Sequence, residues 1–412
     1  LNGMKKCKEL GKIPVSMAID TWAVDYVLLD EKDQILGDTY GYRDHRTDGM
    51  DAEVAKILPE TELYGKTGIQ KQIFNTVYQL MAVKQQTPEL LQQAKTLLML
   101  PDYFGFRLTG NKLSEYTNGS TTQLVDPHTY QWDKELIRKL GYPEDIFLPL
   151  QMPGTKVGQL LPEIQKEVGF DLEVVLCGSH DTASAVMAVP QTEGDGIYIS
   201  SGTWSLMGIE SLKPVITEDA AAANFTNEGG YDHRFRFLKN IMGLWMIQSV
   251  RHEYNDAYSF AQLCDMAEES KEFPSRVDVN DQSFLSPDSM VEAIRQYCHK
   301  TGQPVPESVG ELTSVVYRSL AQSYGETVRG LEKIAGKTYD SIHIIGGGSN
   351  AAYLNQLTAD ATGKTVYAGP GEATAIGNLL AQMIHAGDLA DLKSARKCVR
   401  ESFEIKAFAP AK

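Results

Sequence analysis

Cysteine is scarce in this sequence, and the few cysteines are scattered. The chain has 412 residues and only 5 cysteines, none of which forms a Cys-x-x-Cys motif. This spacing indicates neither a zinc site nor a disulfide framework, so we predict no metal-ligating side chains. Unpaired cysteines are typical of a reducing compartment, and we therefore expect a cytoplasmic protein.

Long apolar runs and an excess of positive charge are also missing. No stretch has the length and apolar character of a membrane span, and no signal-peptide pattern is present. Lys and Arg number 39 against 54 Asp and Glu, which gives a formal net charge of −15. This balance argues against nucleic acids and anionic membranes as partners. An anionic substrate would have to be held by local backbone amides and a metal ion rather than by the overall charge.

Internal repeats and low-complexity tracts are absent, which argues against solenoids and repeat arrays. A chain of 412 residues is too long for one hydrophobic core, so two domains are expected. Val189–Gly196 combines Pro, Gly and acidic residues and is the best candidate for a linker.

What the sequence does contain is an acidic residue between a predicted strand and a predicted helix. Val174–Cys177 is a short apolar run typical of a buried strand, and Thr182–Val189 has apolar residues at helical spacing. Asp181 therefore lies at the edge of the sheet where ligands of α/β proteins gather. The helix dipole favours an ionised carboxylate there, and such a group could accept a proton from an attacking hydroxyl in a phosphotransferase. An Asp before a helix can equally be only an N-cap.

Acids also end the first predicted strand. Val15–Asp25 reads as a strand that carries Asp20 and Asp25 at its end, and Tyr26–Tyr40 has the pattern of a hairpin. Tyr42–Arg46 and Ser114–Thr122 are rich in polar and charged residues. Ordinary solvated loops explain both of these segments.

Four further segments have the pattern of helices. We predict them over Pro88–Leu98, with an end before Pro101, and over Ile241–Val250, Val309–Ala335 and Glu372–His385.

A turn of small residues follows the predicted linker. Gly196–Glu210 reads as strand–turn–strand, and its turn, Ser200–Thr203, offers backbone N–H groups and hydroxyls. Such a turn can cradle a phosphate, although an ordinary hairpin has the same pattern.

A run of three glycines lies late in the chain. Gly346–Gly348 follows the predicted strand Ser341–Ile345 and precedes the predicted helix Ala351–Thr362, which fits a nucleotide site because bare backbone can approach a ligand closely. The run also fits a relaxed Rossmann fingerprint, but that requires an acid after the next strand, and Tyr367–Gly369 offers none. A dehydrogenase is therefore a weak alternative, and a close-packed turn without a ligand remains open. With the Asp181 turn and the Ser200–Thr203 turn, the glycines would make a phosphotransfer site between two domains.

Many segments, in order and over nearly the whole chain, resemble the FGGY carbohydrate kinases. The resembling stretches are Ala18–Asp30, Tyr42–Gly49, Leu98–Gly110, Glu115–Asp126, Ser179–Val186, Ser200–Gly208, Asn227–Gly230, Leu238–Trp245, Gly346–Asp360, Gly363 and Glu372–Asn378. The resemblance implies an actin-like ATPase fold of class α/β, with two ribonuclease-H-like domains and the active site between them. We expect a sugar-binding domain over 1–189, an ATP-binding domain over 190–385 and a segment 386–412 that packs back toward the first domain.

Within the family the match is to the kinases of L-rhamnulose. It implies transfer of a phosphoryl group from ATP, with Mg²⁺, to give L-rhamnulose 1-phosphate in L-rhamnose catabolism, by a monomer or weak dimer. By motif, Asp181 matches the catalytic base. The matching sugar contacts are Ala23, His180, Asp181, Thr182 and Asn240, and the matching ATP contacts are Thr203, Gln248 and Gly348.

The sequence departs from the family pattern in three places. Ala23 stands where the family has a substrate-contacting Gly, and Ala351 stands where the signature has Asn. The first phosphate-binding hairpin, with its D-x-G-x-S-type turn, is not found before Val15. We therefore expect a first domain without its N-terminal strands, which would leave an open sheet edge and remove donors to the phosphoryl group.

The sequence leaves three other functions open. One is a kinase for another sugar or polyol, such as xylulose, fuculose or glycerol, which Trp22, His180 and Asn240 should discriminate. The second is a remnant that binds sugar or ATP without turnover, as the missing hairpin suggests. The third is an actin-like structural protein, which the Ser179–Asp181 turn makes the weakest of the three.

Overall fold

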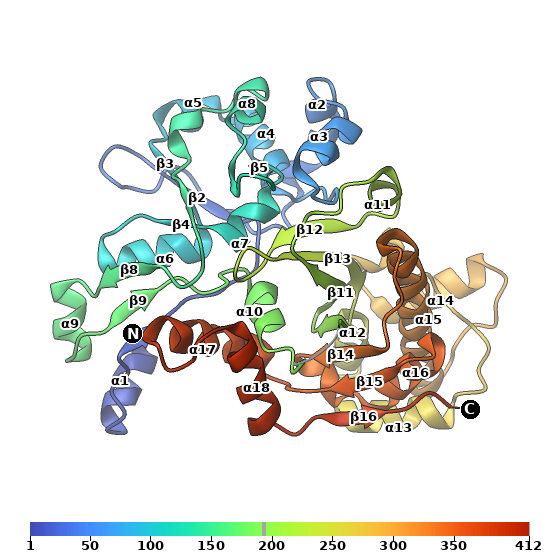
Figure 1. Cartoon of the computed structure of the whole chain (residues 1–412). Helices are drawn as coiled ribbons and strands as arrows, with labels where there is room; N and C mark the ends of the chain where they lie inside the picture. The colour runs from blue at the N-terminus through green and yellow to red at the C-terminus, as the bar shows by residue number, and fades with distance from the viewer. Residues whose placement is uncertain (192–194, 412) are drawn as a thin grey trace. The chain divides into compact units, whose positions relative to one another are not determined.

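The computed structural model describes residues 1–191 and 195–411, which form two compact units built from separate chain segments (Figure 1). The first unit combines Leu1–Met187, Glu210–Phe237 and Thr374–Ala395, and the second combines Ala188–Ile209, Leu238–Ala373 and Arg396–Lys412. The domain limits expected from the sequence, 1–189, 190–385 and 386–412, stay a prediction. The two compact units are not continuous in sequence, because the later segments Glu210–Phe237 and Thr374–Ala395 pack with the first unit.

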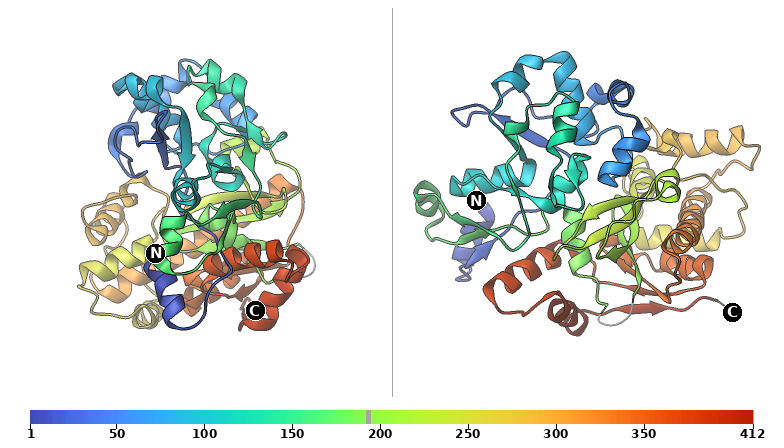
Figure 2. Two further views of the ribbon diagram at one scale, coloured as in Figure 1. Left: turned by 90° about the vertical axis from the view of Figure 1, so that its left-hand side faces the viewer. Right: turned by 45° about the horizontal axis from the view of Figure 1, so that its top comes forward.

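The helices and strands of the first unit are short. In chain order they are α1 Asn2–Glu9, β1 Ser16–Met17, β2 Tyr26–Leu29, α2 Met50–Ala55, α3 Glu60–Thr67, α4 Thr76–Gln86, α5 Pro88–Gln93, β3 Thr96–Met99, α6 Leu100–Thr109, β4 Ser114–Glu115, α7 Tyr116–Gly119, β5 Val125–Asp126, β6 Gln131–Trp132, α8 Lys134–Lys139, β7 Leu150–Gln151, β8 Lys156–Gln159, α9 Pro162–Val168, β9 Glu173–Val175, α10 Asp181–Met187, α11 Glu218–Ala222, β12 Thr226–Gly229 and α17 Ala373–Ala386. Figure 2 shows the first helix, α1, beside α9, where Lys5 pairs with Glu167 at 2.7 Å.

A small sheet with the strand order β1-β9-β8 positions the acidic turn of this unit. β1 pairs with β9 in parallel, and β8 pairs with β9 antiparallel. The predicted strand Val15–Asp25 is wrong over most of its length, since only Ser16–Met17 is a strand. Beyond it, one isolated bridge joins Thr21 to His180.

Two other predictions in this unit hold only in part. The predicted hairpin is short: Leu29 and Ile35 form an antiparallel bridge, Asp30 N donates to Gln34 O and Leu36 N to Leu28 O, each at 2.9 Å, and β2 pairs antiparallel with β3 as well. The predicted helix Pro88–Leu98 ends at Gln93, and Pro101 lies in the first turn of α6 instead of stopping a helix. A proline is tolerated there because the first helical N–H groups have no partner within the helix.

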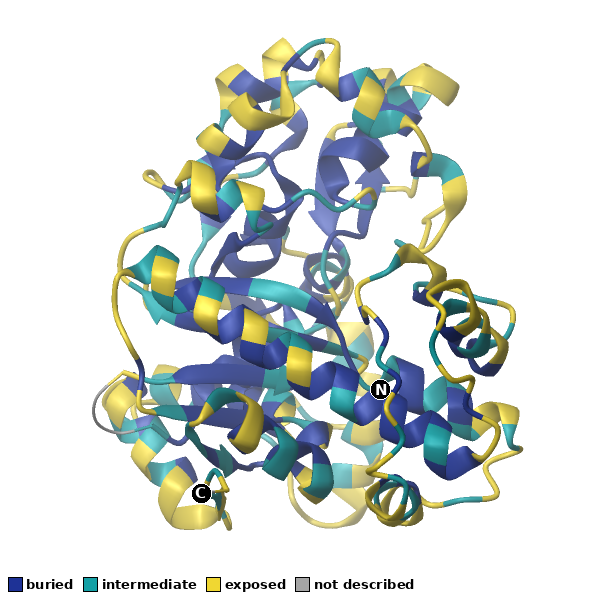
Figure 3. Cartoon of the chain, turned by 90° about the vertical axis from the view of Figure 1, so that its right-hand side faces the viewer, coloured by how far each residue is buried: buried dark blue, intermediate teal, exposed yellow. Residues whose placement is uncertain are grey.

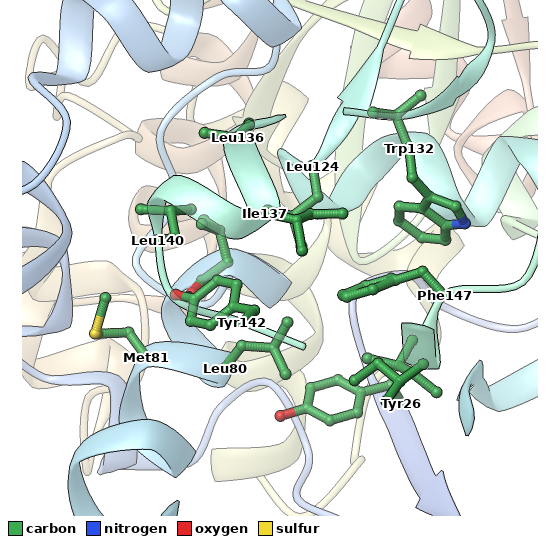
Figure 4. Close-up of a cluster of buried hydrophobic side chains, with 14 of the residues drawn as sticks. Tyr26, Leu80, Met81, Leu124, Trp132, Leu136, Ile137, Leu140, Tyr142 and Phe147 are labelled. Atoms are coloured by element: carbon green, nitrogen blue, oxygen red, sulfur yellow. The ribbon is translucent and has the colours of Figure 1, made fainter. Parts of the chain in front are cut away.

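A cluster of buried side chains forms the core of the first unit (Figure 4). α8 contributes its apolar face, and Asp133 caps this helix by accepting a hydrogen bond of 2.9 Å from Leu136 N. Each fully buried Leu or Ile stabilises the fold by about 1.5–3 kcal/mol. The labelled members of the cluster are Tyr26, Leu80, Met81, Leu124, Trp132, Leu136, Ile137, Leu140, Tyr142 and Phe147.

Most of a mixed sheet with the strand order β12-β13-β11-β10-β14-β15-β16 lies in the second unit, whereas β12 and the start of β13 belong to the first. β10 and β11 form an antiparallel hairpin, β14 pairs in parallel with both β10 and β15, and β16 closes the edge antiparallel to β15. The elements are β10 Ile197–Ser201, β11 Trp204–Ser211, β13 Phe235–Met242, α12 Trp245–Glu253, α13 Phe260–Glu269, α14 Met290–Lys300, α15 Val309–Ala335, β14 Ser341–Ile345, α16 Ala352–Thr362, β15 Thr365–Ala368, α18 Leu392–Ser402 and β16 Lys406–Phe408.

Most predictions for this unit are confirmed. The predicted strand–turn–strand is the β10–β11 hairpin, and the predicted helix Val309–Ala335 has the bounds of α15. The predicted helix Ile241–Val250 begins too early, because Ile241 and Met242 still belong to β13. The predicted linker Val189–Gly196 includes residues 192–194, which lie outside the described residues.

Strands and helices differ in how far their residues are buried. Figure 3 shows strands that are mostly buried and outer helices with exposed faces. Among the described residues, no helix combines the length and the apolar character needed to cross a membrane.

Candidate active site

The turn between β9 and α10 is tightly packed. A Cβ on Gly178 would lie 2.9 Å from Ser184 N, so only glycine allows this approach of the turn to α10. The Ser184 hydroxyl donates to Gly178 O at 2.7 Å. On the other side, Thr21 N donates to Ser179 O and Asp181 N donates to Thr21 O, each at 2.9 Å. The backbone around Asp181 is therefore fixed from both directions.

Glu115, a fully buried acid, binds Ser179 in this turn. Its Oε2 accepts hydrogen bonds from Ser179 Oγ at 2.6 Å and Ser179 N at 3.2 Å, and from Thr117 Oγ1 at 2.7 Å. Burial raises the pKa of Glu115, although these hydrogen bonds lower it in part. The prediction that Ser114–Thr122 is a solvated loop is wrong, because these residues are buried. The sequence offered one signal: Glu115 is followed by the hydroxyl and amide groups that it binds.

Asp181 itself is accessible, with a side chain 45% exposed. Its Oδ1 accepts from Thr182 N at 2.6 Å and from Thr182 Oγ1 at 3.2 Å. An N-cap would instead accept from a backbone N–H two or three residues farther along, so capping does not explain this geometry. In the described part of the chain every hydrogen bond to this carboxylate uses Oδ1, which leaves Oδ2 for another donor.

His180 is held in place by a buried ion pair. Arg236, which is completely buried, donates from Nη2 to Nδ1 of His180 at 2.9 Å, and the same Nη2 lies 3.1 Å from Glu228 Oε2. Burial raises the pKa of Glu228, but the positive charge of Arg236 lowers it, and the pKa lies below its usual value. An arginine carries only donors, so Nδ1 of His180 must accept. Nδ1 also lies 3.3 Å from Glu228 Oε2, and the tautomer that accepts from Arg236 carries its proton on Nε2, 3.5 Å from Asp181 Oδ1.

A second carboxylate, Asp20, lies near Asp181. Asn378 Nδ2 of α17 donates to Asp20 Oδ2 at 2.6 Å, and Gln382 Nε2 donates to Asn378 Oδ1 at 2.7 Å. Burial raises the pKa of Asp20, the hydrogen bond from Asn378 lowers it, and the negative charge of Asp181 raises it further. The two carboxylates therefore interact through their charges.

The predicted sugar contacts Ala23, His180, Asp181 and Thr182 all lie in the first unit. Ala23 is half-buried next to Val24, and Thr182 is buried with its hydroxyl directed at Asp181. The fifth predicted contact, Asn240, lies on β13 in the second unit, where its Oδ1 is buried without a hydrogen-bond partner among the described residues. Arg236, four residues earlier on the same strand, and Glu228 were missed by the sequence analysis.

The three predicted ATP contacts come together in the second unit. Thr203 is exposed in the β10–β11 turn, and Trp245 N donates to Thr203 O at 3.1 Å, so α12 with Gln248 begins at this turn. The glycine run packs on the same hairpin, since a Cβ on Gly348 would overlap Ser201. Parallel pairing of β10 with β14 brings the two turns to one edge of the sheet.

A metal ion is implied by the chemistry expected of the chain. Within residues 1–191 and 195–411, no group of three or more His, Cys, Asp or Glu side chains is placed to hold one. Mg²⁺ in phosphoryl transfer needs only one or two carboxylates, because phosphate oxygens and waters complete its shell. Asp20, which lies near Asp181, is a carboxylate that could serve in this way.

Comparison with known proteins decides the family. A model of the FGGY family of carbohydrate kinases, N-terminal domain, matches residues 5–188, and the model of the C-terminal domain of the same family matches residues 197–386. The chain belongs to the FGGY family of carbohydrate kinases. Family membership confirms the predicted resemblance and overturns the dehydrogenase alternative.

Relatives and solved structures agree with this assignment. The chain of this FGGY kinase is 53% identical over 409 residues to "Rhamnulokinase" of Halalkalibacterium halodurans, covering 99% of the chain and 87% of that protein. It is 46% identical to "Rhamnulokinase" of Bacillus subtilis, covering 100% of the chain and 84% of that protein.

Solved structures share the fold. A ligand-bound xylulose kinase from Lactobacillus acidophilus superposes with a TM-score of 0.80 at 16% identity, over 100% of this chain and 84% of that one. Plasmodium falciparum glycerol kinase with ADP gives a TM-score of 0.74 at 15% identity, over 99% of this chain and 83% of that one. The predicted α/β fold with two domains is confirmed as the FGGY kinase fold.

Proposed function

We propose that this carbohydrate kinase transfers the γ-phosphoryl group of ATP to L-rhamnulose, giving L-rhamnulose 1-phosphate in L-rhamnose catabolism. The sequence identity to proteins named rhamnulokinase, 41–53% over nearly the whole chain, supports this substrate. The observation that carries the chemistry is the Asp181 carboxylate, which is tied down through Oδ1 and accessible through Oδ2.

In the proposed reaction Asp181 is the general base. The oxygen of the C1 hydroxyl attacks the γ-phosphorus of ATP, and the proton of that hydroxyl passes to Oδ2 of Asp181. As the new O–P bond forms, the bond from the γ-phosphorus to the β–γ bridging oxygen breaks, and ADP leaves with its electron pair. The bonds from Thr182 to Oδ1 keep the carboxylate oriented throughout.

The other predicted contacts share the binding of the two substrates. His180 donates from Nε2 to a sugar oxygen, and Asn240 supplies a further polar contact. The backbone at Ala23 lies beside the sugar. On the nucleotide, Thr203 and the backbone at Gly348 contact ATP together with Gln248, since backbone N–H groups in such turns can bind phosphate.

Mg²⁺ accompanies ATP in this proposal. Asp20 is the carboxylate that would hold the ion, which would supply positive charge against the phosphate oxygens.

We further propose that the protein acts in the cytoplasm as a monomer or weak dimer. All five cysteines are free thiols, which suits a reducing compartment that also supplies ATP.

The test compares sugars under one set of conditions. ADP formation is followed with ATP and Mg²⁺ for L-rhamnulose, L-fuculose, D-xylulose and glycerol, and the product is examined by ³¹P and ¹³C NMR. We expect the highest kcat/KM for L-rhamnulose and a phosphate on O1. A higher kcat/KM for another acceptor would overturn the substrate, and sugar binding without ADP formation would support a binding protein instead.

A further inference from the structure

Trp22 is a half-exposed aromatic side chain that is nevertheless firmly anchored. The residue is 48% exposed, yet its indole Nε1–H donates to Oδ2 of Asp25 at 2.6 Å. Asp25 is only 2% exposed. A surface tryptophan can satisfy its N–H with water, so an anchor in the protein interior points to a ring that must keep one orientation.

The anchor is itself part of a buried network. Asp25 Oδ2 also accepts from Tyr42 N at 3.2 Å, and Oδ1 accepts from Gln79 Nε2 at 3.2 Å. Gln79 in turn accepts from Arg46 at 2.5 Å. Burial raises the pKa of Asp25, whereas the hydrogen bonds from Trp22 and Gln79 lower it. Removing one donor would leave a buried acceptor without its partner, which is costly.

The backbone between Trp22 and Asp25 is strained. Val24 has a φ of 70°, which is unfavourable for a β-branched residue. Two hydrogen bonds to Val24 O maintain it, from Thr76 Oγ1 at 2.7 Å and from Gln79 Nε2 at 3.2 Å. Such strain persists only where the surroundings enforce it, commonly at ligand sites.

The backbone just before Trp22 lies beside the turn that carries Asp181. Thr21, the residue before Trp22, exchanges backbone hydrogen bonds with Ser179 and Asp181. The amide of Asn118 lies 3.4 Å from both Trp22 O and Ser179 O and joins the two segments. A sugar whose hydroxyl reaches Asp181 therefore extends into the neighbourhood of Trp22.

We propose that Trp22 is a specificity-determining residue that packs against the C6 methyl group of the sugar, and that Asp25 is its positioning residue. The proposal rests on the proposed function, because L-rhamnulose is a 6-deoxyketose. Since the indole N–H is already bound to Asp25, the ring offers a hydroxyl at C6 no donor. L-fructose is L-rhamnulose with a hydroxyl on C6. On binding, this hydroxyl would lose its hydrogen bond to water and find no partner on the ring, so L-fructose should bind more weakly.

The test is a change of selectivity in Trp22 variants. The ratio of kcat/KM for L-rhamnulose to that for L-fructose is measured for the full chain, for Trp22→Ala and for Trp22→Phe. We expect Trp22→Ala to lower the ratio about tenfold, mainly through KM for L-rhamnulose, because one methyl group in an apolar contact is worth about that factor. The ratio for Trp22→Phe should lie between those of the full chain and Trp22→Ala, since phenylalanine keeps an aromatic face but cannot form the hydrogen bond to Asp25.

Phe104→Ala is the matched control. Phe104 is an aromatic residue of the same unit with a similar exposure, 43%, and its removal should leave the ratio unchanged. Asp25→Asn should lower the ratio as Trp22→Phe does, while circular dichroism reports an intact fold. An unchanged ratio in Trp22→Ala, or equal losses for both sugars, would overturn the proposal.

Failure of the inference can be told apart from failure of the proposed function. If the full chain prefers L-rhamnulose and Trp22→Ala keeps that preference, only the role of Trp22 is wrong. If the full chain forms no ADP, titration calorimetry with the two sugars gives the same comparison from binding alone. A chain that binds the two sugars equally, or binds neither, would overturn the inference.

Discussion

Arg236 donates a hydrogen bond of 2.9 Å to Nδ1 of His180, and neither side chain reaches bulk solvent to any large extent. A guanidinium has no acceptor, so this contact selects the imidazole tautomer with its proton on Nε2. His180 therefore presents a donor beside Asp181, whose carboxylate presents an acceptor. A sugar hydroxyl can accept from the first residue while it donates to the second.

The tautomer can be observed directly. In ¹⁵N spectra of the protein at neutral pH, we expect His180 to show a protonated Nε2 and an unprotonated Nδ1. The signal is assigned by its loss in His180→Gln. A protonated Nδ1 would contradict the role given to Arg236.

The charge of Glu228 should stabilise the fold at neutral pH. We expect Glu228→Gln to lower the free energy of unfolding by about 3 kcal/mol at pH 7, because Arg236 loses its buried counter-charge. The folded-state pKa of Glu228 lies below its usual value, so this stabilisation is present above the unfolded pKa of about 4.3 and is lost as the pH falls through the lower, folded value. Urea unfolding at pH 7 and near pH 3 measures both effects.

A surface ion pair provides the control for that experiment. Glu167 pairs with Lys5 at 2.7 Å but has a side chain 47% exposed, so Glu167→Gln should cost less than about 1 kcal/mol. The same loss for Glu228→Gln at both pH values would show that the charge of Glu228 is not what stabilises the fold.

Asp181→Asn should abolish the proton transfer while keeping the shape of the side chain. We expect kcat to fall by about 10² or more, with ATP affinity nearly unchanged, because the amide cannot accept the hydroxyl proton. Steady-state rates and nucleotide titration measure the two quantities, and Asp388→Asn at an exposed site is the control. Near-normal turnover in Asp181→Asn would remove Asp181 as the base.

Thr203→Val should affect the nucleotide more than the sugar. The change keeps the volume of the side chain but removes the hydroxyl that the exposed β10–β11 turn offers to phosphate. We expect KM for ATP to rise while KM for the sugar changes little. Equal increases for both substrates would contradict the assignment of Thr203 to the ATP site.

Gly377 should tolerate no side chain. A Cβ there would overlap the carbonyl oxygen of Ser184 on α10, so we expect Gly377→Ala to destabilise the fold by about 3 kcal/mol in urea unfolding. Gly330 on α15 is the matched helical glycine, with no atom of the described residues near its would-be Cβ. Gly330→Ala should stabilise by about 0.5–1 kcal/mol, since alanine favours the helix. Similar effects of the two changes would contradict the close packing of α17 on α10.

Local signals explain which parts of the fold could be predicted. The bounds of α15 follow from neighbouring residues, because Ser308 and Glu311 form a capping box and Gly336 ends the helix with a φ of 62°. The Asp181 turn was found for the same reason, as strand, turn and helix are adjacent in sequence. The predicted strand Val15–Asp25 failed because its pairing depends on β9, far away in the chain.

The missed residues of the site are those whose role depends on burial. Glu115 and Arg236 look like ordinary surface residues in the sequence, and only the fold places them in the interior. A buried charge is kept only when partners compensate it, and those partners, Ser179 for the first and Glu228 for the second, are set by tertiary contacts. No local pattern reveals such pairs.

Sugar-dependent ADP release is the decisive measurement for the proposed reaction. This chain is incubated with ATP, Mg²⁺ and L-rhamnulose, with parallel reactions that contain no sugar, L-fuculose, or the Asp181→Asn variant. We expect ADP release that requires L-rhamnulose, exceeds the release with L-fuculose and falls steeply in Asp181→Asn. ADP release that is independent of sugar, or unchanged in Asp181→Asn, would contradict it.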